Sequence, residues 1–177
     1  MTIETLAQQG REKIHTGLAG MDIAKLKQMR NAGLRSCFTH MDELKYRMEF
    51  VATIHGKQFI NDAAGRNLNA TWYALESNEG ENLTWITKGG VDQDYGMLAP
   101  VVKQKVRRII CIGNGKFIKN HLASAARHIE EVNDMREAVN SALYGSLEKT
   151  TVIFSPASDT SDMESEGRSF RHEVDEL

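Results

Sequence analysis

Two short apolar runs in the second half of the chain restrict its fold more than any other feature. Ile109-Ile-Cys-Ile112 and Val152-Ile-Phe154 contain no charged side chain and no strongly polar one. Runs of this kind are typical of central parallel strands that other elements cover on both faces. The sequence therefore predicts a buried parallel sheet.

Further short apolar runs alternate with amphipathic stretches, which is the pattern of an α/β fold. The predicted strands are residues 48–54, 57–60, 83–87, 108–112 and 150–154, with a weaker sixth at 128–132. The predicted helices are residues 69–77, 95–106, 116–123, 135–147 and 167–176. His55-Gly56 suggests a hairpin between the first two strands. We expect an α/β fold with a Rossmann-like, mostly parallel sheet of about six strands flanked by helices.

The first forty residues have a different pattern and predict an N-terminal helical arm. Residues 5–16 and 22–31 form two polar amphipathic helices, separated by Gly17 and Gly20 and ended at Gly33. The expected organisation is an arm at residues 1–40 and one domain at residues 41–177. Such an arm packs on the main domain, mediates oligomerisation or grips a partner, and the sequence leaves these alternatives open.

Composition excludes several classes of protein. The chain has 41% hydrophobic and 26% charged residues, as in soluble globular proteins, and its net charge of −2 gives no general attraction to nucleic acid or to an anionic membrane. The N-terminus is polar and no apolar run is long enough to span a membrane, so a cytoplasmic location is expected. Cys37 and Cys111 are predicted to be buried thiols, and the histidines show no spacing for a metal site.

A colinear series of motifs resembles the C-terminal domain of the Mur ligases, most of all the UDP-N-acetylmuramoyl-alanine–D-glutamate ligases. The resemblance covers residues 34–177, and each motif is weak alone, whereas their order along the chain is fairly specific. The matching segments are Tyr46-Arg-Met-Glu-Phe-Val51, Phe59-Ile-Asn-Asp62 with Asn67, Ala70-Thr-Trp-Tyr-Ala-Leu-Glu-Ser77, Trp85-Ile86, Gly89-Gly-Val-Asp92, Ile109-Ile-Cys-Ile-Gly113 and Ser155-Pro-Ala157.

The resemblance implies a nucleotide contact and a substrate contact at particular positions. Arg47 matches an arginine that approaches the ATP phosphates in the family, and Asp62 matches an aspartate near the nucleotide. Ser155 begins a Ser-Pro-Ala loop near the substrate. From the residues alone, a structural role is favoured: Arg47 pairs with a carboxylate such as that of Glu49, and Asp62 caps its own loop.

The opening loop departs from the family pattern. Mur ligases typically read Asn-Asp-Ser-Lys-Ala-Thr-Asn here, and the lysine and threonine hold the carboxylate of the incoming amino acid. This chain has Ala63 at the serine position, Ala64 at the lysine position and Arg66 at the threonine position. Arg66 is therefore the remaining candidate for binding a substrate carboxylate, with a longer and differently placed cation. The glycine loop after Gly89-Gly-Val-Asp92 and the loop after Ala157 are altered as well.

The chain also has no P-loop motif. Gly113-Asn-Gly-Lys116 is the nearest sequence, but Ile110 and Phe117 stand where the motif requires glycine and a hydroxyl. We therefore expect a pseudoenzyme with no catalytic residue, no metal and no cofactor, unless a partner with the P-loop domain supplies ATP. The expected function is a non-catalytic interaction or structural subunit. The alternatives are a component of a split ATP-dependent ligase and, less favoured, a nucleotide-binding regulator. The expected partner is another protein or a second copy, with no nucleic acid and no membrane insertion.

One basic stretch is a further candidate for binding. Residues 103–119 contain six cationic side chains and no acidic one: Lys103, Lys105, Arg107, Arg108, Lys116 and Lys119. The stretch fits a solvated helix end beside a buried strand, or a surface for phosphate or an acidic partner. In the second case the acidic residues 159–166 of another copy are a possible complement.

Overall fold

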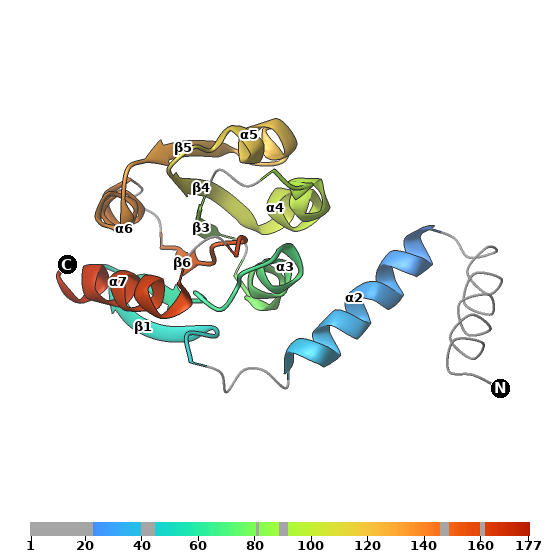
Figure 1. Ribbon diagram of the computed structural model, residues 1–177, viewed down its shortest axis with the longest axis horizontal. Helices are drawn as coiled ribbons and strands as arrows, with labels where there is room; N and C mark the ends of the chain where they lie inside the picture. The colour runs from blue at the N-terminus through green and yellow to red at the C-terminus, as the bar shows by residue number, and fades with distance from the viewer. Residues whose placement is uncertain (1–22, 40–44, 81, 89–91, 146–148, 160–161) are drawn as a thin grey trace. The chain divides into compact units, whose positions relative to one another are not determined.

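A computed structural model describes residues 23–39, 45–80, 82–88, 92–145, 149–159 and 162–177 of the chain (Figure 1). The chain consists of two units, Met1–Thr39 and His40–Leu177. In the first unit the structure describes one helix, α2 (Ile23–Thr39). The predicted helix at residues 5–16 lies outside the described residues.

The expectation that Gly33 ends the second helix of the arm is wrong. α2 continues through Gly33 to Thr39. A glycine inside a helix costs only about 1 kcal/mol relative to alanine, so one glycine does not by itself terminate a helix. Because the helix continues, Cys37 lies on its exposed surface and is not the buried thiol that the sequence predicted, whereas Cys111 is buried in a strand as expected.

The second unit is built on a six-stranded sheet with the order β1-β2-β6-β3-β4-β5. β1 is antiparallel to β2, and all other neighbouring strands are parallel. This confirms the predicted α/β fold with a mostly parallel sheet, including the hairpin at His55-Gly56. The strands are β1 (Glu49–Ile54), β2 (Lys57–Asn61), β3 (Leu83–Lys88), β4 (Val106–Ile112), β5 (His128–Val132) and β6 (Thr151–Phe154).

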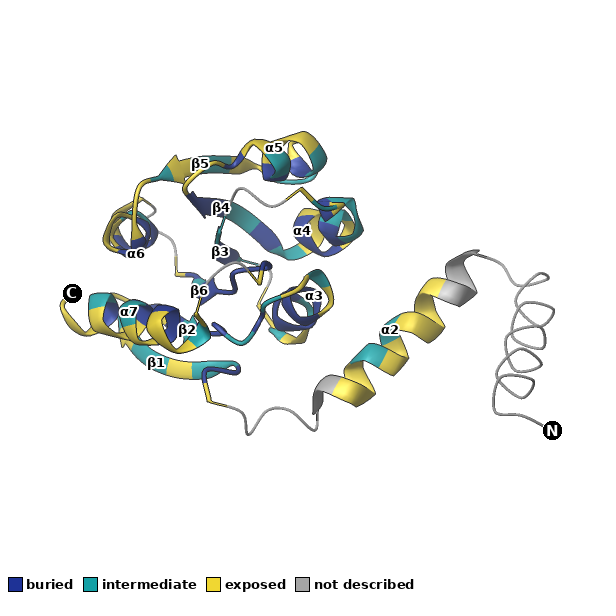
Figure 2. Ribbon diagram, viewed as in Figure 1, coloured by how far each residue is buried: buried dark blue, intermediate teal, exposed yellow. Residues whose placement is uncertain are grey.

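Helices cover both faces of the sheet (Figure 1). One face carries α3 (Leu68–Ser77), the short 3₁₀ helix η1 (Tyr95–Leu98), α4 (Ala99–Lys105) and α5 (Lys116–Leu122). The other face carries α6 (Met135–Tyr144) and α7 (Met163–Asp175), which pack against each other. The sides of these helices that face the sheet are buried (Figure 2). The apolar runs around Ile110 and Ile153 are therefore covered on both faces, which explains why they contain no charged residue.

The limits of two predicted helices differ most from those in the structure. The stretch predicted as one helix at residues 95–106 is divided into η1 and α4, with Pro100 in the first turn of α4, where a proline needs no hydrogen-bond partner. α7 begins at Met163, four residues before the predicted start, because Asp162 caps it by accepting a hydrogen bond from the Ser165 amide. The predicted start of α6 is correct: the Asp134 side chain accepts a hydrogen bond from the Glu137 amide at 2.9 Å.

Aromatic packing fixes α7 against the first strands of the sheet. The ring of Phe170 stacks on that of Phe154, with 5.4 Å between centroids, and lies 6.5 Å from that of Phe59. All three side chains are fully buried. This contact holds α7, the helix that follows β6, in a defined position against β2 and β6. Among the described helices, none combines the length and the apolar character that crossing a bilayer would require.

Candidate functional site

The loops that follow β2 and β6 lie side by side at the carboxyl edge of the sheet. Asn61 and Phe154, the last residues of these two parallel strands, are paired, so Asp62 and Ser155 leave the sheet next to each other. The chain then continues from β2 to α3 on one face and from β6 to α7 on the other (Figure 1). Neighbouring parallel strands whose connections diverge in this way form the crevice in which open α/β sheets bind ligands. The fold therefore places its expected ligand site here.

Arg47, Asp62 and Ser155, three of the four predicted binding residues, meet at this point and bind one another. Asp62 Oδ1 accepts hydrogen bonds from Arg47 Nη1 at 2.8 Å and from the Met48 amide at 3.3 Å. Its other oxygen, Oδ2, accepts a hydrogen bond from the Ser155 hydroxyl at 2.8 Å. The side chains of Arg47 and Asp62 are almost completely buried. Both oxygens of the carboxylate are therefore occupied by groups of the chain itself.

The network continues through Thr71 and the backbone of Gly65. The Thr71 hydroxyl lies 2.8 Å from the Ser155 hydroxyl and donates to the Gly65 carbonyl at 3.2 Å. The same carbonyl accepts a hydrogen bond from the Ala157 amide at 2.9 Å. A Cβ atom at Gly65 would collide with Ser155 Oγ and Asp62 Oδ2, so only glycine allows the loop to lie this close. The crevice between β2 and β6 is thus filled by a buried network of hydrogen bonds.

Burial changes the acidity of Asp62. Removal from water raises the pKa of this carboxyl group from 3.8 to about 7, although the charge of Arg47 and the hydrogen bond from Ser155 oppose the change. The desolvation of a buried ion pair therefore offsets much of its attraction, as is usual for such pairs. The hydrogen bonds to Asp62 therefore stabilise the network more than the attraction between the charges of Arg47 and Asp62 does.

The stability of the fold should depend on pH through Asp62. Since its pKa is raised in the folded state, the folded chain binds more protons than the unfolded chain between about pH 4 and pH 7. The contribution of Asp62 is fully present below pH 4 and is lost as the pH rises through 7. We expect this group to lower the unfolding free energy by up to about 1.4 kcal/mol per pH unit across that window. Urea unfolding of the wild type and of Asp62→Asn at several pH values measures this pH dependence. If the unfolding free energies of the two proteins changed in parallel with pH, the prediction would be wrong.

Arg66, the fourth predicted binding residue, lies apart from this network. Its guanidinium forms an ion pair with the carboxylate of Asp159, in the loop after β6, and donates to the Asp159 carbonyl at 3.4 Å. About a third of the Arg66 side chain is exposed. The cation expected to bind a substrate carboxylate is therefore paired with a carboxylate of its own chain.

Another ion pair lies further along the same edge of the sheet. Lys88, the last residue of β3, pairs with the buried Glu166 of α7 at 2.9 Å. Beside them a hollow of about 280 Å³ extends to Asn133, at the start of α6. Residues 89–91, most of the predicted glycine loop that follows Lys88, lie outside the described residues. The described part of this edge thus offers one small hollow with a paired cation.

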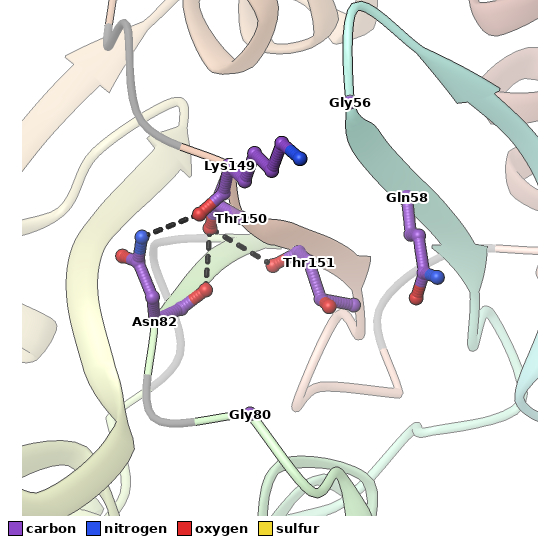
Figure 3. Close-up of a pocket in the computed structure, with 7 residues that line it drawn as sticks. All are labelled: Gly56, Gln58, Gly80, Asn82, Lys149, Thr150 and Thr151. Carbon is purple, nitrogen blue, oxygen red and sulfur yellow. Dashed lines mark hydrogen bonds between the residues drawn. The ribbon is translucent and has the colours of Figure 1, made fainter.

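A larger hollow of about 390 Å³ lies at the opposite, amino-terminal edge of the sheet (Figure 3). Its wall includes Asn82, Lys149 and Thr150, and two of these side chains connect the segments that lead into β3 and β6. The Asn82 amide donates to the Lys149 carbonyl, and the Thr150 hydroxyl donates to the Asn82 carbonyl, both at 2.6 Å. The side chains of Asn82 and Thr150 thus join two strands, and none of the predicted site residues lines this hollow.

Half of the predicted basic stretch has partners within the chain. Lys105 donates to the carbonyls of Glu76 and Asn78 at the end of α3. Arg108 binds both carboxylate oxygens of Glu130 at 2.8 Å, and Lys119 pairs with Glu131 at 3.1 Å. These cations connect neighbouring elements of the fold. No cluster of three or more potential metal ligands occurs among the described residues.

Comparison with known proteins identifies the origin of this domain. A UDP-N-acetylmuramoylalanine–D-glutamate ligase of Christiangramia forsetii is 34% identical over 184 aligned residues, which cover 100% of this chain and 41% of the ligase. The protein of the same name from Cytophaga hutchinsonii is 34% identical over 163 residues, 88% of this chain and 33% of that protein. The match lies in the C-terminal part of these ligases. The chain is homologous to the C-terminal part of the Mur ligases.

The fold agrees with this relationship. A solved domain assigned to a UDP-N-acetylmuramate:L-alanyl-gamma-D-glutamyl-meso-diaminopimelate ligase of Haemophilus ducreyi superposes with a TM-score of 0.50 at 10% identity, over 71% of this chain and 98% of that domain. At this identity the likeness concerns the fold alone. No protein-family model matches the chain. The chain spans about two fifths of the length of the first relative, so the activity of whole Mur ligases does not transfer to it directly.

The comparison with the Mur ligase pattern correctly predicted where the crevice lies, but it did not predict which residues fill it. Thr71, Gly65 and Asp159 were not predicted to belong to the site. Gly65 stands where the family pattern has alanine, and this difference is a signal in the sequence that the loop lies close to the residue after β6. Thr71 follows the helix cap Asn67 by one turn, a position that points back toward the loop.

Proposed function

We propose that this chain is a non-catalytic interaction or structural domain derived from a peptidoglycan-precursor ligase. The observation that supports this most is the occupied crevice at the β2–β6 switch point. Both carboxylate oxygens of Asp62, which would otherwise face a ligand, accept hydrogen bonds from Arg47, Met48 and Ser155. A nucleotide or substrate that entered the crevice would have to break these hydrogen bonds, and Asp62 would gain no equivalent donors in exchange.

Two further observations support the same function. Ala64 has no side-chain donor where the family pattern has lysine, and its amide donates to the Tyr46 carbonyl at 3.1 Å, which ties the loop to the chain before β1. Arg66 is paired with Asp159. Among the described residues, each of the binding positions named above is thus either without a side-chain donor or already engaged within the chain.

The alternative function is a component of a split ligase that contributes Arg47, Asp62 and Arg66 to an ATP site on another chain. One observation favours it: Arg66 lies at the surface, and an exposed ion pair such as Arg66–Asp159 contributes only about 1 kcal/mol or less. A substrate carboxylate delivered by a partner could therefore replace Asp159 at small cost.

Amide spectra of the full chain separate these functions. With millimolar Mg-ATP and UDP-N-acetylmuramoyl-L-alanine, we expect no saturable shift at the amides of Ala63, Arg66 and Ala157. Saturable shifts at these amides that Arg66→Ala abolishes would contradict the proposal. So would release of phosphate when the chain is mixed with the ATP-binding part of a Mur ligase, Mg-ATP, UDP-N-acetylmuramoyl-L-alanine and D-glutamate. The complete ligase of Christiangramia forsetii serves as the positive control for turnover.

A further inference from the structure

The two edges of the sheet differ in how well they are protected from pairing with another strand. An open strand edge attracts further strands unless charged side chains, proline or a covering element prevents it. At one edge, β5 carries Glu130 and Glu131, which form ion pairs with Arg108 and Lys119. At the other edge, β1 carries a single charged residue, Glu49, followed by Phe50-Val-Ala-Thr-Ile54. In the described part of the chain no strand lies beyond β1.

Phe50 makes this edge unusual. Its side chain is 57% exposed, one of three large hydrophobic side chains with such exposure among the described residues. Thr53 is exposed as well, whereas Val51, Ala52 and Ile54 pack against the buried core on the side of α7. Phe50 and Thr53 therefore share the face of β1 that points away from α7.

A bulge causes this arrangement. Phe50 pairs with Ile60 and Ala52 pairs with Phe59, so Val51 is an extra residue in β1 with no partner of its own in β2. In a regular strand, residues three positions apart lie on opposite faces. The extra residue shifts the alternation, so that Phe50 and Thr53 lie on one face and Val51 and Ala52 together on the other.

This pattern is complementary to itself. When β1 is placed antiparallel to a second β1 about a twofold axis between Val51 and Ala52, Phe50 lies opposite Thr53 of the copy. Val51 then lies opposite Ala52 of the copy, and Glu49 opposite Ile54 of the copy. Each pair consists of residues on the same face, and no two like charges meet. The faces match along the whole strand because both strands contain the bulge; in two regular strands the residues paired in this register would lie on opposite faces.

We propose that a second copy of this chain binds at β1, and that the two β1 strands pair antiparallel to form one continuous sheet. Twofold symmetry is the usual form of such an interface, because the same surface serves both partners. The aromatic ring of Phe50 packs against Thr53 of the copy, a favourable cross-strand pair that occurs twice. This association is independent of the crevice at β2 and β6, so it holds whether or not the domain binds a nucleotide.

Sedimentation of the full chain over a concentration series tests the proposal. We expect a dimer, and Phe50→Lys and Thr53→Glu should each raise its dissociation constant about tenfold or more, because each substitution occurs twice in the interface. Combining Phe50→Lys with Thr53→Glu should restore dimerisation, since each new lysine lies opposite a new glutamate of the copy. Tyr144→Lys, at another exposed aromatic residue, is the matched control and should leave the dimer unchanged.

Three results would overturn this interface. The first is a wild-type chain that remains monomeric at the highest attainable concentration. The second is a dimer that Tyr144→Lys weakens as much as Phe50→Lys does. The third is a double variant that is no more dimeric than the single variants, which would exclude the proposed register. Amide spectra of each variant establish that the domain is folded, so that loss of the dimer is not confused with loss of the fold.

Discussion

Asp62→Ala is expected to lower the free energy of unfolding by about 3–5 kcal/mol, the usual effect of removing one partner of a buried ion pair. The substitution leaves two buried groups without their hydrogen-bond partner, the guanidinium of Arg47 and the hydroxyl of Ser155, whereas an Asp62 side chain keeps contact with both even when it is protonated. Urea unfolding measures the loss of unfolding free energy, provided that the m value, the slope of this free energy against urea concentration, stays the same. The effect is large because both side chains are almost fully removed from water.

A double variant separates the ion pair from the loss of volume. Arg47→Met with Asp62→Leu removes both charges and keeps apolar bulk, so we expect it to be clearly more stable than Asp62→Ala. If the double variant were as unstable as the single one, the cost would come from packing and not from the unpaired cation. An effect of Asp62→Ala below about 1 kcal/mol would show that the network does not hold the two loops together.

Gly65→Ala is expected to destabilise the fold by about 1–3 kcal/mol, although it restores the residue of the family pattern. The added methyl group would collide with Ser155 Oγ and Asp62 Oδ2, which are held on both sides by hydrogen bonds. The loop must therefore move away from β6, and the hydrogen bond between Gly65 and Ala157 should weaken. Thermal or urea unfolding together with amide exchange at Ala157 measures both effects.

Gly80→Ala is the matched control for this substitution. A methyl group at Gly80 meets no atom within 4 Å, so its effect should stay within about 0.5 kcal/mol. If Gly65→Ala were equally harmless, the loop could adopt a more open conformation at no cost. The crevice would then be available to a ligand, and the proposed non-catalytic function would lose its main support.

The fold was largely predictable because its signals are local. Apolar runs such as Ile109-Ile-Cys-Ile112 report burial on both faces of a strand, and Asp134 reports a helix start through a hydrogen bond to a residue three positions away. The predictions failed where a single residue was taken to decide the limits of a helix and the residues around it decided them instead. Gly33 did not end α2, and Pro100 began a new helix within a stretch predicted as one.

The candidate site was predictable in its position and not in its contacts. The resemblance to the Mur ligases correctly directed attention to Asp62 and Ser155, which follow neighbouring strands. It did not reveal that Arg47 binds Asp62 or that Asp159 binds Arg66. For Arg47, the structural alternative named Glu49 as a possible partner, whereas Glu49 pairs with Arg171 of α7 at 2.6 Å. The choice among carboxylates depends on which elements pack together.

By itself, the sequence determined the parallel sheet, the hairpin before β2, most of the helices and the relationship to the C-terminal part of the Mur ligases. Only the tertiary structure decided what the residues at the positions of the family pattern do in this chain. Asp62 is 15 residues from Arg47 and 93 residues from Ser155, and these three meet because β6 inserts beside β2. Strand order brings the groups together and burial makes their pairing necessary, and neither property can be read from the residues next to them.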